Sequence, residues 1–409
     1  MNNFAVGLDI GSHAIKAIVG EVGRDGGLTI VDVLTVPSSG LRKGIIQDVS
    51  DATQALSPII GEIRKISKAA SSNIFLGVGS SDLKVQSSIG VVAVSRADFE
   101  IYEDDVNRAI QSAQAVNLAP NRMVLHSIVK EYIVDGVHDI RDPLEMTGNR
   151  LEVSSLIIDA FQPVVKNFTK CVEILGGELG GLILTPLADA RAVLTKNQKE
   201  LGVVLIDIGF GKTSMCVYEE GKLLHAAIFP VGSGNVTNDL AIGLKMPIEA
   251  AEMVKLSFGS AVAREVGFRD TVELKKIDPR SKGTVTKKFI SEIIEVRLAE
   301  IFEFVNNELK YIGKSARLPA GAVLVGGGAK IPSIVDLAKQ ELKMSVQIGV
   351  PESSFFRFRN SELAAKVEDP EFVCALGLLL SGHDKALGAK TMQLPMKGFL
   401  RKVFRYFAP

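Results

Sequence analysis

Two segments of the sequence share one pattern: an apolar strand, Asp-Ile-Gly, a turn of small residues and a second apolar strand. The first spans residues 6–20 (VGLDIGSHAIKAIVG) and the second spans residues 204–218 (VLIDIGFGKTSMCVY). Glycines in such turns allow several backbone N–H groups to face one point, and they let an anion approach without a Cβ in the way. One copy alone would be typical of an ordinary turn. Two copies predict a duplicated domain that holds a phosphate chain between its halves.

The two turns also contain side chains suited to phosphate and Mg²⁺. Ser12 and Thr213 offer hydroxyl donors, and Lys16 offers a positive charge. Asp9 and Asp207 lie at the strand ends, where they could hold Mg²⁺ through its water shell, because this ion keeps several waters and takes few protein ligands. The predicted phosphate-binding residues are Gly11, Ser12, His13, Lys16, Gly209, Phe210, Gly211 and Thr213.

A third segment, residues 322–334 (AVLVGGGAKIPSI), reads as a strand that runs into three glycines and then a helix. Its backbone can lie against a flat ligand such as adenine, which predicts adenosine contacts at Gly327, Gly328 and Ile331. Three glycines after a strand are also common in plain loops. Residues 211–213 are not the end of a P-loop, because that motif needs a glycine where Ile206 stands, and the three glycines lack the Rossmann spacing.

The elements that would position these turns can be predicted from periodicity. Strands are expected at 28–36 and 74–78, besides the two hairpins, and alternation over 85–94 begins a separate unit. Residues 232–312 are predicted to be mostly helical, with a lysine-rich stretch at 275–288. The other predicted helices cover residues 52–70, 103–116, 163–175 and 371–380.

Composition is typical of a packed α/β protein of two domains. The chain has 409 residues, 46% of them hydrophobic, with 38 glycines and a formal net charge of zero. Zero net charge gives no overall electrostatic support for a nucleic-acid partner. Cys171, Cys216 and Cys374 are scattered, which favours a reducing compartment over disulfides or a zinc site. Neither a signal peptide nor a membrane-spanning segment is expected.

The end of the chain, MKGFLRKVFRYF at residues 396–407, predicts an amphipathic helix. Its apolar residues fall within an arc of about 140°. A helix of this length is about 18 Å long, too short to cross a hydrocarbon core of about 30 Å, but it could lie in the membrane interface. Docking on the protein body is the alternative. The predicted membrane-binding residues are Met396, Lys397, Phe399, Leu400, Arg401, Lys402, Val403, Phe404, Arg405 and Phe407.

The two hairpins and the glycine segment, in this order, resemble the actin and heat-shock-chaperone ATPase superfamily. Within it, four further stretches resemble the FtsA family of bacterial cell-division proteins, and together they span nearly the whole chain. The four stretches are SGLRKGIIQD at 39–48, VLHSIVKEYIVD at 124–135 with Asn149-Arg150-Leu151, GNVTNDLA at 234–241, and the amphipathic tail.

This resemblance implies an α/β fold of the actin-like, ribonuclease-H-like class, with duplicated domains, nucleotide in the cleft between them and an inserted FtsA-type subdomain. The implied organisation is a first core subdomain (1–83 and 163–200), the insertion (84–162), a second core subdomain (201–231 and 313–381), a small upper subdomain (232–312), a linker (382–395) and the membrane-targeting helix (396–409).

The resemblance also implies roles for single residues. Glu252 and Lys255, one helical turn apart, match the pair that reaches adenosine in the superfamily; a solvated ion pair is the alternative. Phe210 departs from the family, which has glycine there, and Thr185 stands where the chaperone ATPases have an acidic residue before a proline. A neutral hydroxyl is a poor general base. ATP hydrolysis is therefore expected to be slow, and turnover comparable to that of a metabolic kinase would contradict this.

The function implied is that of an ATP-binding and Mg²⁺-binding division protein that polymerises like actin. It would tether FtsZ through its upper subdomain to the inner face of the cytoplasmic membrane at the division site, and it would recruit later division proteins. The expected partners are FtsZ, further copies of the chain and anionic lipid, without nucleic acid. The alternatives are another actin-like scaffold, such as a PilM-like or MreB-like protein, and a sugar- or acetate-kinase-type phosphotransferase.

Overall fold

The computed structural model describes residues 3–388, and these contain two sheets built to one plan. The first has strands β1 (Asn3–Ile10), β2 (Ala14–Val22), β3 (Leu28–Pro37), β6 (Ile74–Val78), β11 (Leu179–Leu184) and β19 (Phe356–Phe358). The second has strands β12 (Val203–Ile208), β13 (Thr213–Glu219), β14 (Lys222–Phe229), β17 (Ala322–Val325) and β18 (Val346–Ile348).

The strand orders show the predicted duplication. They are β11–β6–β1–β2–β3–β19 in the first sheet and β14–β13–β12–β17–β18 in the second. In each sheet an antiparallel hairpin, β1–β2 or β12–β13, is continued by a third antiparallel strand, β3 or β14. A parallel strand, β6 or β17, pairs with the other side of the hairpin. Both predicted hairpins and the predicted strand at 74–78 are therefore confirmed.

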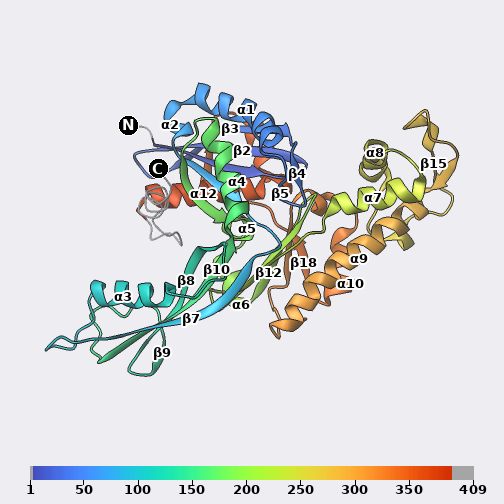
Figure 1. Ribbon diagram of the computed structural model, residues 1–409. Coiled ribbons are helices and arrows are strands. Elements are labelled where there is room, and N and C mark those ends of the chain that lie inside the picture. The colour runs from blue at the N-terminus through green and yellow to red at the C-terminus, as the bar shows by residue number, and fades with distance from the viewer. Residues whose placement is uncertain (1–2, 389–409) are drawn as a thin grey trace.

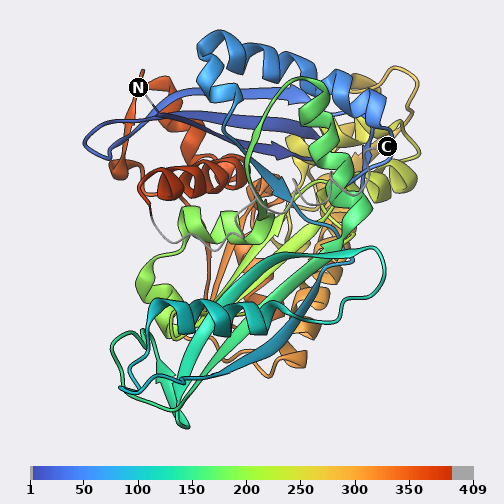
Figure 2. The ribbon, with the colours of Figure 1, turned by 60° about the vertical axis from the view of Figure 1, so that its left-hand side comes forward.

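Alternation along β1 places side chains in two different cores, because successive residues of a strand point to opposite faces. Val6 and Leu8 pack with helices α1 (Val49–Ile66) and α4 (Gln162–Ile174) on the outer face. Ala5 belongs to the inner core, which also contains Leu205 of the second sheet. Helices α5 (Thr185–Val193) and α12 (Val373–Ala386) contribute to this inner core, and Figure 2 shows α12 (red) beneath the first sheet (blue).

The outer face of the second sheet is covered by the helical upper part of the molecule, which lies on the right in Figure 1. Its buried core joins strand residues such as Val204 and Ile206 to Leu240, Val254 and Leu298 of the helices. The elements of this part are α7 (Ser233–Leu244), α8 (Ile248–Phe258), α9 (Lys287–Tyr311), β15 (Thr271–Glu273) and β16 (Thr284–Thr286). Helix α10 (Ile334–Leu342), which follows β17, also contributes to this core.

The inserted unit projects on the opposite side of the molecule (Figure 1). It is a sheet of order β7–β10–β8–β9 with one helix against it. The helix approaches so closely that a Cβ on Gly90 would lie 2.1 Å from the carbonyl oxygen of Ala109. The elements are β7 (Lys84–Ala93), α3 (Glu103–Gln114), β8 (Arg122–Val134), β9 (Val137–Ile140) and β10 (Arg150–Phe161).

Short elements complete the described chain. They are β4 (Leu41–Arg42), β5 (Ile45–Ile46), α2 (Lys68–Ser71), α6 (Lys196–Leu201), α11 (Glu362–Glu368) and the 3₁₀ turns η1 (Ala263–Glu265), η2 (Leu274–Lys276), η3 (Gly327–Lys330), η4 (Ser353–Phe355) and η5 (Pro370–Phe372).

Both ends of one predicted helix need correction. The helix predicted over 52–70 begins earlier, at Val49, because the Asp48 side chain accepts a hydrogen bond from the Asp51 N–H at 3.0 Å and so caps it. It ends at Ile66, and Ser67 caps the separate helix α2.

The predicted linker 382–395 begins too early, because α12 continues to Ala386. Tertiary contacts hold its last turns. The Asp384 carboxylate accepts a 2.8 Å ion-paired hydrogen bond from the Arg191 guanidinium, and the His383 ring lies 2.7 Å from the carbonyl oxygen of Gly26. Among the described helices, none is long and apolar enough to cross a membrane. The predicted membrane-binding residues 396–407 lie outside the described part of the chain.

Candidate functional site

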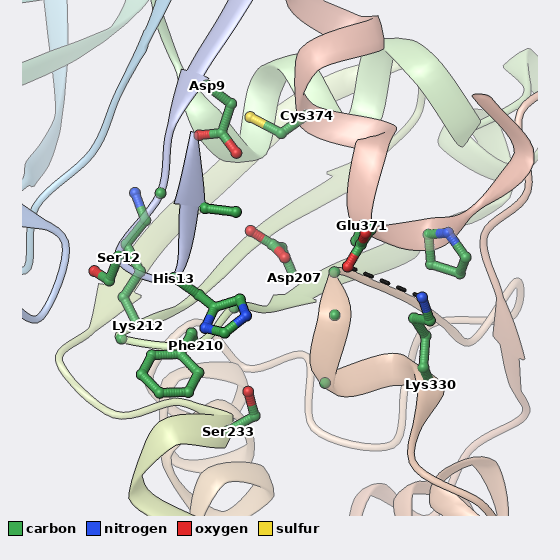
Figure 3. A pocket seen from close by; sticks show the side chains of 18 of the residues that line it. Asp9, Ser12, His13, Asp207, Phe210, Lys212, Ser233, Lys330, Glu371 and Cys374 are labelled. Atoms are coloured by element: carbon green, nitrogen blue, oxygen red, sulfur yellow. Dashed lines mark ion pairs between the residues drawn. The ribbon is translucent and has the colours of Figure 1, made fainter. Parts of the chain in front are cut away.

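A cavity of about 330 Å³ lies between the two halves, within the size range of ligand sites. Its wall combines the turn of the first hairpin, the turn of the second, the glycine loop after β17, one face of α8 and the start of α12. Figure 3 shows Asp9 and Asp207 approaching it from the two hairpins. Of the predicted phosphate, adenosine and metal residues, all except Thr213 line this cavity.

Thr213 is the exception among the predicted phosphate-binding residues. It begins β13, which lies between β12 and β14 and is covered on both faces, so its side chain is fully buried. The hydroxyl of Thr213 has no hydrogen-bond partner among the described residues. It therefore does not reach the cavity, and the neighbouring residue Lys212 lines it instead.

Lys212 lines the cavity from the second predicted phosphate turn, although it was not among the predicted phosphate-binding residues. Its Nζ donates to the carbonyl oxygen of Gly79 at 3.1 Å and to Thr185 Oγ1 at 3.3 Å, both in the first half of the molecule. The second turn thus places a positive charge against the first half of the molecule. Its position inside a predicted phosphate turn was the signal that could have identified it.

The backbone of the second turn is oriented by α7. The Ser233 and Gly234 N–H groups donate to the carbonyl oxygens of Gly209 and Phe210, each at 2.8 Å. These bonds direct the negative carbonyl ends toward the helix. In the first turn, Ser12 Oγ accepts a hydrogen bond from the Gly44 N–H at 2.9 Å, and Lys16 lines the cavity with its Nζ 5.6 Å from the centre of the Phe372 ring.

The glycine loop approaches the second hairpin too closely for side chains at two positions. Gly326 has φ of 86°, and a Cβ there would lie 2.1 Å from Asp207 Oδ1. A Cβ on Gly328 would lie 2.4 Å from Cγ2 of Ile208. At Gly327 the nearest atom would be Glu371 Oε2 at 3.8 Å, so only this glycine has space beside it.

The pair on α8 is enclosed rather than solvated. Lys255 Nζ lies 2.7 Å from Glu252 Oε2, and the lysine side chain is 4% exposed. The ammonium also donates to Thr237 Oγ1 at 3.0 Å. Burial lowers the pKa of Lys255, and the Glu252 carboxylate partly offsets this effect. The sequence-based alternative of a solvent-exposed ion pair is therefore wrong.

A buried carboxylate that the sequence missed, Asp189, lies beside the predicted pair Asp9 and Asp207. It lines the cavity from α5, one helical turn after Thr185, and this i,i+4 spacing was the available signal. Burial, then the charges of Asp207 and Asp9, raise the pKa of Asp189 well above its ordinary value.

The donor set fits a hydrated hard cation. Asp9 and Asp207 supply oxygen ligands of the kind that Mg²⁺ prefers, and the cavity leaves room for water. In the described part of the chain, no three His, Cys, Asp or Glu side chains are arranged to hold a metal ion directly. A cation held by few direct protein ligands is the arrangement that suits these residues.

Asp207 gives a testable pH dependence. Burial raises its pKa to about 6, with Lys212 lowering it and Asp9 raising it. A carboxyl with a higher pKa in the folded protein stabilises the fold while protonated. This contribution is complete below about pH 4 and is lost as the pH rises through about 6. Asp207→Asn should therefore raise the free energy of unfolding at pH 7.5, by at most about 3 kcal/mol.

The measurement is urea unfolding of the nucleotide-free protein between pH 4.5 and 7.5. The increase in the free energy of unfolding caused by Asp207→Asn should become smaller toward low pH. Partial exposure of the carboxylate to solvent will make this increase smaller than the upper limit. Asp104→Asn, at a side chain that is 74% exposed on α3, is the control. A variant that is less stable than the parent at pH 7.5 would contradict the prediction.

Family models match the chain over two ranges: one described as Cell division protein FtsA covers residues 204–377, and one described as SHS2 domain inserted in FTSA covers residues 80–159. The cell division protein FtsA of Pseudomonas aeruginosa is 34% identical over 389 residues, covering 95% of this chain and 91% of its own. The FtsA of Bacillus subtilis is 36% identical over 378 residues, covering 92% of this chain and 83% of its own.

Two solved structures share the fold. A PilM–PilN type IV pilus biogenesis complex aligns with a TM-score of 0.65 at 17% identity, covering 93% of this chain and 98% of its own. MreB5 of Spiroplasma citri bound to ADP aligns with a TM-score of 0.54 at 12% identity, covering 94% of this chain and 98% of its own. At these identities the likeness concerns the fold, and it confirms the predicted actin-like class.

Proposed function

This chain belongs to the FtsA family of cell-division proteins and has an actin-like fold, and from that premise we propose that it binds ATP in the cleft between its halves. The observation that supports this most directly is the cavity lined by both hairpin turns and by the glycine loop. An actin-like neighbour of known structure was solved with ADP bound. The turns would hold the phosphates, and Gly327, Gly328 and Ile331, with Glu252 and Lys255, would hold adenosine.

Mg²⁺ would accompany the nucleotide, held through water by Asp9 and Asp207. Charge balance supports this placement, because Asp9, Asp207 and the phosphates of ATP together carry more negative charge than Lys16 and Lys212, which line the same cavity, can offset. Thr185 lines the cavity where the chaperone ATPases have an acidic residue, and its neutral hydroxyl is a poor general base. Slow hydrolysis, with nucleotide acting mainly as a conformational switch, is the expected result.

In the division machinery, the chain would form actin-like filaments and bind FtsZ through the upper subdomain at 232–312. The amphipathic segment 396–407 would hold it on the inner face of the cytoplasmic membrane at the division site. Later division proteins would then be recruited to this complex. Family membership supports each of these roles, and the tail supports membrane binding independently through its basic and apolar faces.

No observation favours a second function. The likeness to the PilM–PilN complex is at 17% identity and concerns the fold alone.

Liposome co-sedimentation with ATP tests membrane tethering. The full chain should pellet with vesicles that contain phosphatidylglycerol, and a chain ending at Leu394 should stay in the supernatant. Burial of a large apolar side chain is worth about 1.5–3 kcal/mol, so loss of several should abolish pelleting.

A matched pair of full-length variants separates the two faces of the tail. Leu400→Glu with Phe404→Glu changes the apolar face and should prevent pelleting. Lys397→Gln with Lys402→Gln changes the basic face and should weaken binding only to anionic vesicles, because each basic residue contributes about 1 kcal/mol there. Equal pelleting of the truncated and full chains would refute the tail as the anchor.

A further inference from the structure

An aromatic contact joins the two predicted phosphate turns across the cleft. The His13 ring, in the turn after β1, faces the Phe210 ring, in the turn after β12, with centroids 5.0 Å apart and planes at 34° (Figure 3). Both residues line the cavity. The contact therefore links the first half of the molecule to the second at the phosphate end of the site.

Phe210 is held firmly on its own side of the cleft. The Lys255 ammonium lies 5.6 Å from the centre of its ring, and the buried ion pair with Glu252 fixes that lysine. On another side the ring lies against Gly234, where a Cβ would come within 2.7 Å of it. The ring thus has little freedom within the second half, and His13 is its contact in the first.

The turns touch at a second point beside the rings. A Cβ on Gly211 would lie 2.5 Å from Ser12 Oγ, and a Cβ on Gly44 would lie 2.8 Å from Cδ of Lys212. The second phosphate turn therefore touches the first at Ser12 and the loop between β4 and β5 at Gly44. Phe210 provides the aromatic ring of the second turn in this contact.

We propose that Phe210 is a positioning residue that clasps the two halves of the cleft through His13 and slows nucleotide release. This proposal rests on the proposed ATP binding. A nucleotide held between the halves can leave only when they separate, and separation breaks the stack. Aromatic pairs of this geometry add enough stabilisation to slow release about two- to tenfold. The stack also keeps the His13 ring over the phosphate turns.

The first experiment needs no nucleotide. Hydrogen–deuterium exchange is measured on the nucleotide-free full chain for the parent and for Phe210→Ala. Exchange should rise in both turns, residues 9–14 and 209–213, although only one turn carries the substitution. Phe304→Ala is the matched control, because Phe304 stacks on Phe229 at 5.8 Å within the second half alone. Faster exchange confined to residues 209–213 would overturn the clasp.

The second experiment measures release of methylanthraniloyl-ATP with Mg²⁺ by stopped flow. Phe210→Ala and His13→Ala should each speed release about two- to tenfold. The double variant should be no faster than either single one. Unlike His13→Ala, His13→Phe should release nucleotide as slowly as the parent, because it keeps an aromatic ring against Phe210 although it lacks the imidazole nitrogens. Failure of His13→Phe to do so, or additive single effects, would overturn the proposal.

These results separate the clasp from ATP binding itself. If the parent binds no nucleotide, the proposed function fails, and hydrogen exchange still decides whether the clasp exists. If the parent binds ATP and Phe210→Ala releases it at the parent rate, the proposed function stands and the clasp fails. Phe210→Leu, which keeps apolar bulk, replaces Phe210→Ala if that variant does not fold, and it should also speed release.

Discussion

Replacing Gly327 by valine is expected to weaken ATP binding at least about tenfold while leaving the melting temperature unchanged. Gly327 lines the cavity, and a Cβ there meets no atom closer than Glu371 Oε2 at 3.8 Å. The Cβ of valine would therefore fit the nucleotide-free protein, and its two methyl groups would occupy cavity space that a flat base needs. Tenfold weaker binding corresponds to about 1.4 kcal/mol. Titration calorimetry with ATP and a thermal unfolding scan measure the two quantities.

The neighbouring glycine provides the contrast. At Gly328 a Cβ would lie 2.4 Å from the Ile208 side chain and 2.8 Å from its carbonyl oxygen. Gly328→Ala should therefore lower the melting temperature even without nucleotide, because overpacking costs about 1–3 kcal/mol. Unchanged ATP affinity in Gly327→Val would remove the glycine loop from the adenosine site.

The second large effect is expected at Gly377, where α12 crosses α5 between the two sheets. A Cβ there would lie 1.8 Å from the carbonyl oxygen of Ala188, which is main chain and cannot move aside as a flexible side chain could. Gly377→Ala should cost about 3 kcal/mol or more, at the upper end of overpacking effects. Urea unfolding of the nucleotide-free protein measures this loss.

Gly61 is the matched control, since it also lies inside a helix, α1, but a Cβ there meets nothing within 4 Å. Alanine has the higher helix propensity, so Gly61→Ala should be neutral or stabilise the protein by up to about 1 kcal/mol. If both variants keep the stability of the parent, the helices do not pack as closely as described.

Local pattern determined much of this protein. Alternating apolar residues around Asp-Ile-Gly predicted both hairpins, because strand pairing through a short turn depends on neighbours in sequence. Repetition of that pattern predicted the duplication, and the glycine run predicted the third wall of the cavity. The same local reasoning failed at the end of α12, where Arg191 and Gly26 bind Asp384 and His383 from distant parts of the chain.

Tertiary structure alone decided the inner details of the site. Thr213 and Lys212 are neighbours in one turn, but coverage of β13 on both faces buries the threonine, and the lysine reaches Gly79 from 133 residues away. Asp189 is buried beside Asp207 because α5 packs against α12. Burial and charge proximity depend on which segments meet in space, and a pattern of neighbouring residues does not contain that information.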